Sequence, residues 1–141
     1  MMNTTEFCRC AHTTRDTLRF YDTLGILKPQ RLPNNYRDYT ADDLNNYQII
    51  QNLKAAGISL SEIAQILALR TQPVTASCRN DVLTIIQQNA ADFAKQQQFY
   101  AQLLQITNQM HASLQAGHQE QLAGLIEQFG RLGEPAASRH P

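Results

Sequence analysis

The fold is decided by residues 14–29, TRDTLRFYDTLGILKP, which describe one short helix and the segment that leaves it. Thr14 can cap the N-terminus of this helix, because its hydroxyl can accept a hydrogen bond from a backbone N–H in the first turn. The apolar residues that follow at helical spacing are Leu18, Tyr21 and Leu24. We therefore expect them to form one buried face. Gly25 is placed to end the helix, since glycine readily adopts the left-handed conformation at a helix C-terminus.

A second short helix is predicted just before this one, over residues 4–11. Thr4 or Thr5 can cap it, and Phe7 and Ala11 can face inward. A tight turn of two residues then leads to the next helix. Two helices joined in this way have the geometry that sets the N-terminal side chains of the second helix into the major groove of DNA.

Arg15 and Arg19 lie one turn apart at the start of the second helix, so both project from the same side. From there an arginine can reach a phosphate or the edge of a guanine. The whole chain carries 12 basic and 12 acidic residues and has no net charge, but residues 9–37 carry six basic and two acidic residues. The distribution of charge, and not its total, therefore indicates a nucleic-acid partner.

Helical periodicity is lost over residues 26–39, where two prolines interrupt the pattern. Asn34 and Asn35 tolerate a left-handed backbone conformation, so we expect a small hairpin, or wing, in this segment. The basic and aromatic side chains that the wing adds are Arg31, Tyr36, Arg37 and Tyr39.

Two further helices are predicted after the wing. Thr40 can cap the first, which ends at Gly57, and the second opens at Ser59 or Ser61. Their apolar residues at helical spacing are Leu44, Tyr47, Ile50 and Leu53, and then Leu60, Ile63, Ile66 and Leu67. Pro73 is the expected boundary between two parts of the molecule.

A single long helix is predicted beyond this boundary, since no glycine or proline occurs from Asp81 to Ala116. At 1.5 Å per residue it would be roughly 50 Å long. Positions in alternating steps of four and three form a heptad seam. They are Val82, Ile86, Asn89, Phe93, Gln96, Tyr100, Leu103, Thr107, Met110 and Leu114. The polar members weaken such an interface but can fix its register.

This long helix has nothing in its own chain large enough to cover its apolar stripe, so it needs a partner, and the simplest one is a second copy. The residues expected to make the dimer are Val82, Ile86, Phe93, Tyr100, Leu103, Met110 and Leu114. After Gly117 an amphipathic segment can fold back onto the dimer. Its apolar residues are Leu122, Leu125, Ile126 and Phe129. We expect the residues from Gly133 onward to be disordered.

Three motifs occur in a fixed order: residues 14–29, then NYRDYT at 35–40, then LKAAGISLSEI at 53–63. They resemble the recognition helix and wing entry, the wing return, and the junction of the third and fourth helices in the MerR (mercury-resistance regulator) family of transcriptional regulators. Asn35 stands where that family usually has glycine, and asparagine also tolerates positive φ. The segment Cys8-Arg9-Cys10 departs from the family's usual start. The resemblance covers about half of the chain.

The resemblance implies a mainly α-helical fold with a winged helix-turn-helix DNA-binding domain and a long helix that forms an antiparallel coiled coil. We expect the domain over residues 1–70, a linker at 71–80, the dimerisation helix at 81–117, and a short amphipathic segment and tail at 118–141. The implied function is a homodimeric regulator that binds a near-palindromic promoter operator and distorts it in response to an effector or stress. The residues implied to contact DNA are Thr14, Arg15, Arg19, Tyr21, Tyr36, Arg37 and Lys54.

The expected partners are double-stranded promoter DNA, a second copy of the chain, and RNA polymerase at the promoter. We expect no membrane association, because no apolar run approaches the roughly 20 residues that span a bilayer. A cytoplasmic protein is expected, since the first residues do not resemble a secretion signal. No cofactor is expected.

The three cysteines are too few for a disulfide framework and are interpreted as free thiols. Cys78 precedes the long helix, where the metal-sensing branch of the family has a ligand, but the cysteine pair that follows the helix in that branch is missing. One thiolate cannot form a closed soft-metal site. Cys78, His111 and His118 remain candidates for a zinc site shared between subunits, and oxidation of Cys8 or Cys78 also remains open.

Two other classes of protein compete with this interpretation. An enzyme is not expected, because the sequence offers no nucleophile with its base, no paired carboxylates and no phosphate-binding glycine loop. The alternative is a helical adaptor whose coiled coil recruits another protein and whose winged domain does not bind DNA. The zero net charge and the eleven glutamines from Gln87 to Gln121 are compatible with it.

Overall fold

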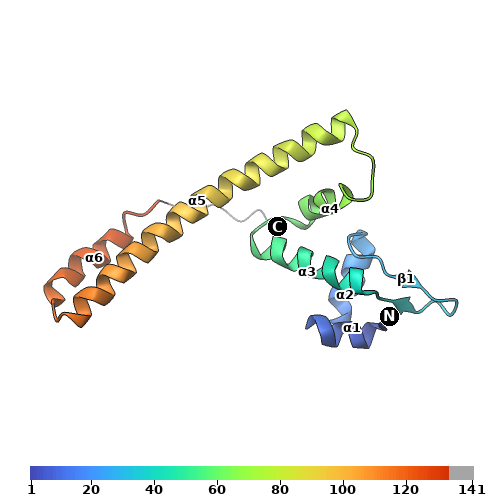
Figure 1. Cartoon of the computed structure of the whole chain (residues 1–141), viewed down its shortest axis with the longest axis horizontal. Helices are drawn as coiled ribbons and strands as arrows, with labels where there is room; N and C mark the ends of the chain where they lie inside the picture. The colour runs from blue at the N-terminus through green and yellow to red at the C-terminus, as the bar shows by residue number, and fades with distance from the viewer. Residues whose placement is uncertain (134–141) are drawn as a thin grey trace. The chain divides into compact units, whose positions relative to one another are not determined.

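The computed structural model of the protein describes residues 1–133 and is mainly helical, as predicted (Figure 1). The chain divides into two compact units, Met1–Val82 and a second that begins at Leu83. The tail that the sequence predicts to be disordered begins at Gly133, and its residues 134–141 lie outside the described part. Within residues 1–133, no helix is both long enough and apolar enough to cross a membrane.

The N-terminal unit is a helix-turn-helix followed by a wing and two more helices. Its elements are α1 Thr4–Ala11, α2 Arg15–Leu24, β1 Gln30–Arg31, β2 Arg37–Asp38, α3 Ala41–Ala55 and α4 Leu60–Ala68. The wing strands are antiparallel, with Arg31 opposite Arg37. Met2 extends this small sheet, because its backbone exchanges two hydrogen bonds of 2.7 Å each with Tyr39.

Helix boundaries in this unit follow local capping chemistry. Thr14, Thr40 and Ser59 each accept a hydrogen bond from a first-turn N–H, which confirms these predicted caps. The cap of α1 is Asn3, and not Thr4 or Thr5 as predicted. Asn3 forms a reciprocal capping box in which its side chain accepts from the N–H of Glu6 at 2.8 Å while the Glu6 carboxylate accepts from the Asn3 N–H.

Gly25 and Asn35 adopt the left-handed backbone conformation that the sequence predicts, and His12 adopts it without having been predicted to. Gly25 ends α2 with a φ of +80°. His12 in the turn between α1 and α2 and Asn35 in the wing have φ values of +55° and +67°. These are the only non-glycine residues with positive φ in the described part of the chain. Both occur where the chain reverses direction, so the turn and the wing are built into the local sequence.

An aromatic cluster forms the core of this unit. The ring of Phe7 lies 4.5 Å from that of Tyr39 and 5.8 Å from that of Tyr47, and Tyr47 in turn lies 6.2 Å from Tyr21. Rings at these separations contribute pairwise attraction beyond the area they bury. Leu24 does not join the predicted buried face of α2, since it is 47% exposed in the last turn of the helix.

The long helix α5 spans Ala76–Gln115. It begins five residues before the predicted start at 81, because Thr75 caps it by accepting a hydrogen bond from the Cys78 N–H at 3.1 Å. The segment 76–80, which was predicted to belong to a linker, is therefore helical. The helix ends two residues before the predicted 117, and Gly117 follows with a φ of +77°.

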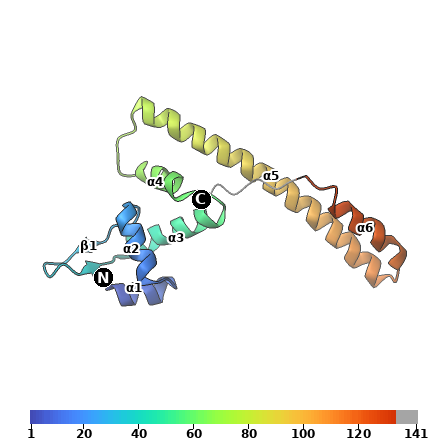
Figure 2. The ribbon, with the colours of Figure 1, turned by 180° about the vertical axis from the view of Figure 1, so that it is seen from behind.

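The chain then folds back along the end of α5. A short 3-10 helix, η1 Gln119–Gln121, leads into α6 Leu122–Phe129, which lies beside α5 in both views (Figures 1 and 2). The Ser113 hydroxyl donates a hydrogen bond to the Gln121 amide oxygen at 3.0 Å across this contact. Leu125 is buried as predicted, whereas Ile126 is 54% exposed.

An apolar stripe remains uncovered on α5 in the single chain. We call it the α5 stripe, and its members are Ile86, Phe93, Tyr100, Leu104 and Leu114. The heptad pattern predicts all of them except Leu104, whereas Val82, another predicted seam residue, is already buried in the single chain. Tyr100 and Leu104 are more than 60% exposed. Large apolar side chains at this spacing on a helix call for a covering surface.

We predict that Thr40→Ala lowers the free energy of unfolding by about 1 kcal/mol, because it removes the hydroxyl that accepts a hydrogen bond from the Asp43 N–H at the start of α3. The backbone N–H of residue 40 can still donate to the Asp43 carboxylate. Urea denaturation followed by circular dichroism measures the change. Thr71→Ala, at an exposed position, is the matched control and should leave the midpoint unchanged. Equal midpoints for the two variants would show that the cap does not stabilise the unit.

Candidate nucleic-acid interface

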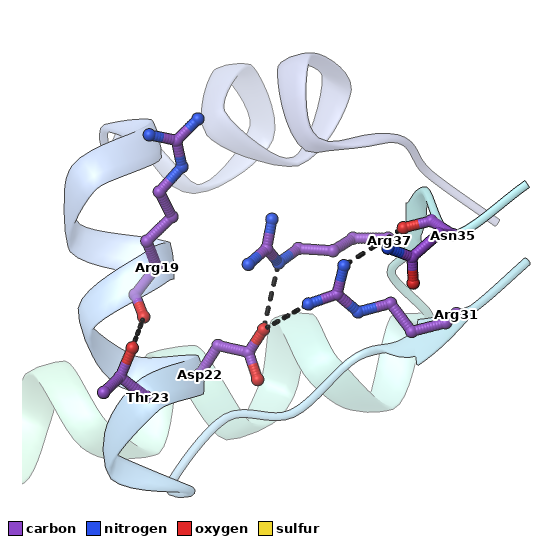
Figure 3. Close-up of polar contacts among 6 residues, drawn as sticks. All are labelled: Arg19, Asp22, Thr23, Arg31, Asn35 and Arg37. Carbon is purple, nitrogen blue, oxygen red and sulfur yellow. Dashed lines mark hydrogen bonds and ion pairs between the residues drawn. The ribbon is translucent and has the colours of Figure 1, made fainter.

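Arg15 and Arg19 are exposed on α2, as the sequence predicts. The Arg15 guanidinium donates a hydrogen bond to the Thr5 hydroxyl, which links α2 to α1. The side chain of Arg19 extends away from the wing contacts in Figure 3, where the only bond drawn to this residue runs from the Thr23 hydroxyl to its carbonyl oxygen. Its guanidinium is therefore available to a ligand.

Asp22 is the point at which α2 holds the wing. Its carboxylate accepts a hydrogen bond from Arg37 at 3.0 Å and another from Arg31 at 3.3 Å (Figure 3). Arg31 also donates to the carbonyl oxygen of Asn35 at 3.0 Å, which fastens the tip of the wing. We name these four residues, Asp22, Arg31, Asn35 and Arg37, the wing clamp.

The wing clamp keeps a net positive charge, since one carboxylate faces two guanidinium groups. The side chain of Asp22 is 17% exposed and that of Arg37 is 24% exposed, so this pair is screened less than a surface ion pair. The side chain of Arg31 is 43% exposed, and its pair is correspondingly weaker. The main effect of Asp22 is therefore to hold Arg37 in a fixed position between α2 and the wing.

A hollow of about 490 Å³ lies between the start of α1, α2 and the wing. We call it the arginine hollow, and its lining residues are Asn3, Thr4, Thr5, Arg15, Arg19, Asn35, Tyr36 and Arg37. Three guanidinium groups and no carboxylate line it. A hollow with this lining attracts anions, and the exposed ring of Tyr36 lies at its edge.

Tyr21 is a core residue of the N-terminal unit. The resemblance implied a DNA contact for it, but the side chain is 1% exposed. Its hydroxyl accepts hydrogen bonds from the Gln51 amide at 3.0 Å and from the Lys54 ammonium at 3.2 Å. In this structure Tyr21 therefore does not face a duplex, and it positions Lys54 at the end of α3.

Sequence reasoning missed the part played by Asp22, which was counted only as one of two acidic residues in a basic stretch. A signal was present, because an acidic residue on the predicted recognition helix precedes a wing that carries two arginines. The site residues that the structure brings together are Arg15, Arg19, Tyr36 and Arg37. Thr14 lies at the start of the same helix as its cap.

The candidate metal ligands do not gather in the described part of the chain, where no three histidine, cysteine, aspartate or glutamate side chains form a group that could hold a metal ion. Cys78 and Cys10 are exposed, and Cys8 is half-buried. The imidazole of His118 lies 3.5 Å from the Glu120 carboxylate on η1.

Comparisons with known families find two matching family models. Residues 2–69 match a family described as MerR HTH family regulatory protein. Residues 46–112 match a family described as MerR, DNA binding. The two matches overlap, and together they include the wing, α1 to α4 and most of α5.

Two curated relatives are transcriptional regulators by name. The HTH-type transcriptional regulator HmrR of Rhizobium leguminosarum bv. viciae is 35% identical over 61% of this chain, and the alignment spans 65% of that protein, less than two thirds of its length. A probable heavy metal-dependent transcriptional regulator of Haemophilus influenzae is 31% identical over 81% of this chain and 88% of its own. Neither is named as an enzyme.

A solved structure shares the fold. It is that of HiNmlR, a MerR family regulator lacking the sensor domain, bound to promoter DNA. The likeness has a TM-score of 0.61 and 21% identity, and it covers 88% of this chain and 94% of the other.

We predict that Asp22→Asn loosens the wing without unfolding the unit, because an amide cannot carry the charge that holds both guanidinium groups. Amide hydrogen exchange over residues 30–38 should become several-fold faster, while exchange in α3 stays unchanged. Asp16→Asn makes the same chemical change at an exposed position of α2 and serves as the control. Unchanged wing exchange in Asp22→Asn would show that the wing clamp does not hold the wing.

Proposed function

Since the chain belongs to the MerR family of DNA-binding transcriptional regulators, we propose that two copies of it bind one near-palindromic promoter operator and regulate transcription by bending and untwisting the DNA. RNA polymerase is the partner that binds the distorted promoter. This activity would place the protein with the chromosome in the cytoplasm.

The arginine hollow is the observation that carries this proposal. Its lining comes both from the N-terminal end of α2 and from the wing. A helix-turn-helix inserts its second helix into a major groove of DNA, and the wing can then reach the adjacent DNA backbone. Arg15 and Arg19 are the proposed DNA contacts of α2, from which an arginine can reach a backbone phosphate or the edge of a guanine. Tyr36 and Arg37 are the proposed contacts of the wing, while Thr14 and Lys54 are proposed to bind further phosphates. Phosphate contacts fix the position of the protein on the duplex, and contacts to base edges specify the sequence.

The α5 stripe supports the homodimer in the proposal. It crosses several helical turns on one side of α5, and an antiparallel second copy would present the same apolar side chains to it. The predicted seam members Leu103 and Met110 are half-buried in the single chain. They lie beside the stripe and would complete its packing.

The proposal also concerns the effector to which the regulator responds. A response to a heavy metal, as in the name of the Haemophilus relative, would need ligands from two copies of this chain, because one copy gathers no ligand group within its described residues. Cys78 of one copy with His111 and His118 of the other are the residues available. The adaptor alternative is not favoured, since the relatives are transcriptional regulators by name.

We predict that the protein protects a near-palindrome in the DNA upstream of the genes it controls, and that Arg19→Ala weakens this binding about tenfold to a hundredfold. Footprinting and fluorescence anisotropy measure both. Arg131→Ala removes the same charge from a residue after α6 and should bind as the unaltered protein does. Equal affinity of the two variants would exclude Arg19 from the interface.

We predict that Tyr100→Glu converts the dimer to a monomer, because it places two carboxylates in an apolar seam. Sedimentation velocity measures the association state, and anisotropy should show loss of operator binding in parallel. Gln98→Glu adds the same charge to an exposed position on another side of α5 and should remain dimeric. A dimeric Tyr100→Glu would place the interface elsewhere.

A further inference from the structure

The hydroxyl of Tyr39 is a buried polar group without a partner. The residue is fully buried at the end of the wing, and its hydroxyl makes no hydrogen bond to any described residue. It is the only side-chain oxygen or nitrogen of this kind in the part of the chain that the structure describes. A buried hydroxyl that lacks a partner destabilises a fold by about 1–3 kcal/mol, so we expect a water or a ligand to hydrogen-bond to it.

A small inner hollow connects Tyr39 with the arginine hollow. It measures about 30 Å³, and its lining residues are Thr4, Arg15, Leu18, Arg19, Arg37 and Tyr39. Thr4 and the three arginines line both hollows, so the two are adjacent. A cavity needs about 10–15 Å³ of this kind of space to hold a water molecule. The inner hollow therefore has room for an ordered water.

Tyr39 cannot turn its hydroxyl elsewhere. Its ring packs against Phe7 at 4.5 Å, and its backbone N–H and carbonyl are both bonded to Met2. Burial raises the pKa of Tyr39, and the nearby Arg37 only partly opposes this effect. The phenol is therefore protonated at neutral pH and can act as a donor.

The hydrogen-bond donors that line the two hollows favour an anion with several acceptor oxygens. Three arginines line the space, and no acidic residue lines either hollow. Guanidinium groups bind phosphate through paired N–H donors. Duplex DNA presents one phosphate per roughly 1.7 Å of its axis. A phosphate of the DNA backbone is therefore the nearest such anion when α2 approaches a duplex.

We propose that the arginine hollow holds one phosphodiester group of the DNA backbone, and that the Tyr39 hydroxyl hydrogen-bonds to it through a single water in the inner hollow. This inference rests on the proposed function and adds to it a positioning residue that does not itself touch the duplex. Tyr39 sets the depth at which the phosphate sits, and thereby the register of α2 in the groove. The contact carries no sequence information, because every nucleotide offers the same phosphate.

The test replaces only the hydroxyl. Tyr39→Phe should weaken binding about three- to tenfold for an operator duplex and for an unrelated duplex alike. The salt dependence of binding should keep its slope, because no charge is removed, whereas Arg19→Ala should lower that slope by about 0.9. The urea midpoint of the free Tyr39→Phe variant should be unchanged or higher, since an unpartnered group has been removed from the core.

Tyr47→Phe is the matched control, because it removes a phenol from the same core at a residue that lines neither hollow. It should bind both duplexes as the unaltered protein does. If Tyr39→Phe binds both duplexes with unaltered affinity, or loses stability in place of affinity, the inference is wrong although the proposed function stands. If the unaltered protein binds no duplex, the proposed function itself is wrong.

A free phosphate ion offers the same chemistry as the DNA backbone. Inorganic phosphate at millimolar concentration should raise the melting temperature of the unaltered protein no more than that of Tyr39→Phe. A phosphate-specific rise that Tyr39→Phe abolishes, together with unaltered duplex binding, would assign the hollow to a free anion and overturn the DNA assignment.

Discussion

Several arginines lie on one face of the N-terminal unit, and the two ion pairs of Asp22 stabilise this arrangement of positive charges. Arg31 and Arg37 would repel each other across the wing if no carboxylate stood between them. The single negative charge holds both on α2 and still leaves an excess of positive charge beside Arg15 and Arg19. Of the three arginines that line the arginine hollow, this acidic residue fixes Arg37 and leaves the charge of the other two uncompensated.

The aromatic cluster packs beneath that face and holds the elements that carry the arginines in fixed positions. Phe7 comes from α1, Tyr21 from α2, Tyr39 from the wing and Tyr47 from α3, so each element that contributes to the hollow also contributes a ring to the core. The positions of the guanidinium groups are therefore coupled to packing and do not depend on surface contacts alone. A regulator that reads a duplex needs such rigidity, because a shift of about an ångström loses a hydrogen bond to a base or a phosphate.

The sequence predicts those features that depend on neighbours in the chain. The caps at Thr14 and Thr40 and the left-handed Asn35 are local, and all three are found as predicted. Asn3 was missed although its capping box with Glu6 is also local, because two threonines competed for the same role. The exposure of Leu24 and the contact between Asp22 and Arg37 depend on how the wing folds back over α2. No periodicity encodes that geometry.

The same cluster determines what optical spectroscopy can observe in this protein. The chain has five tyrosines and no tryptophan. Three of the five, Tyr21, Tyr39 and Tyr47, are buried together in the N-terminal unit, while Tyr36 and Tyr100 are solvent-exposed. Near-ultraviolet dichroism requires rings in a fixed asymmetric setting, so in the single chain the three buried tyrosines make it a reporter of the N-terminal unit. The ring of Tyr100 lies 5.5 Å from that of Phe99 on α5, and its contribution should grow when the proposed dimer fixes its ring.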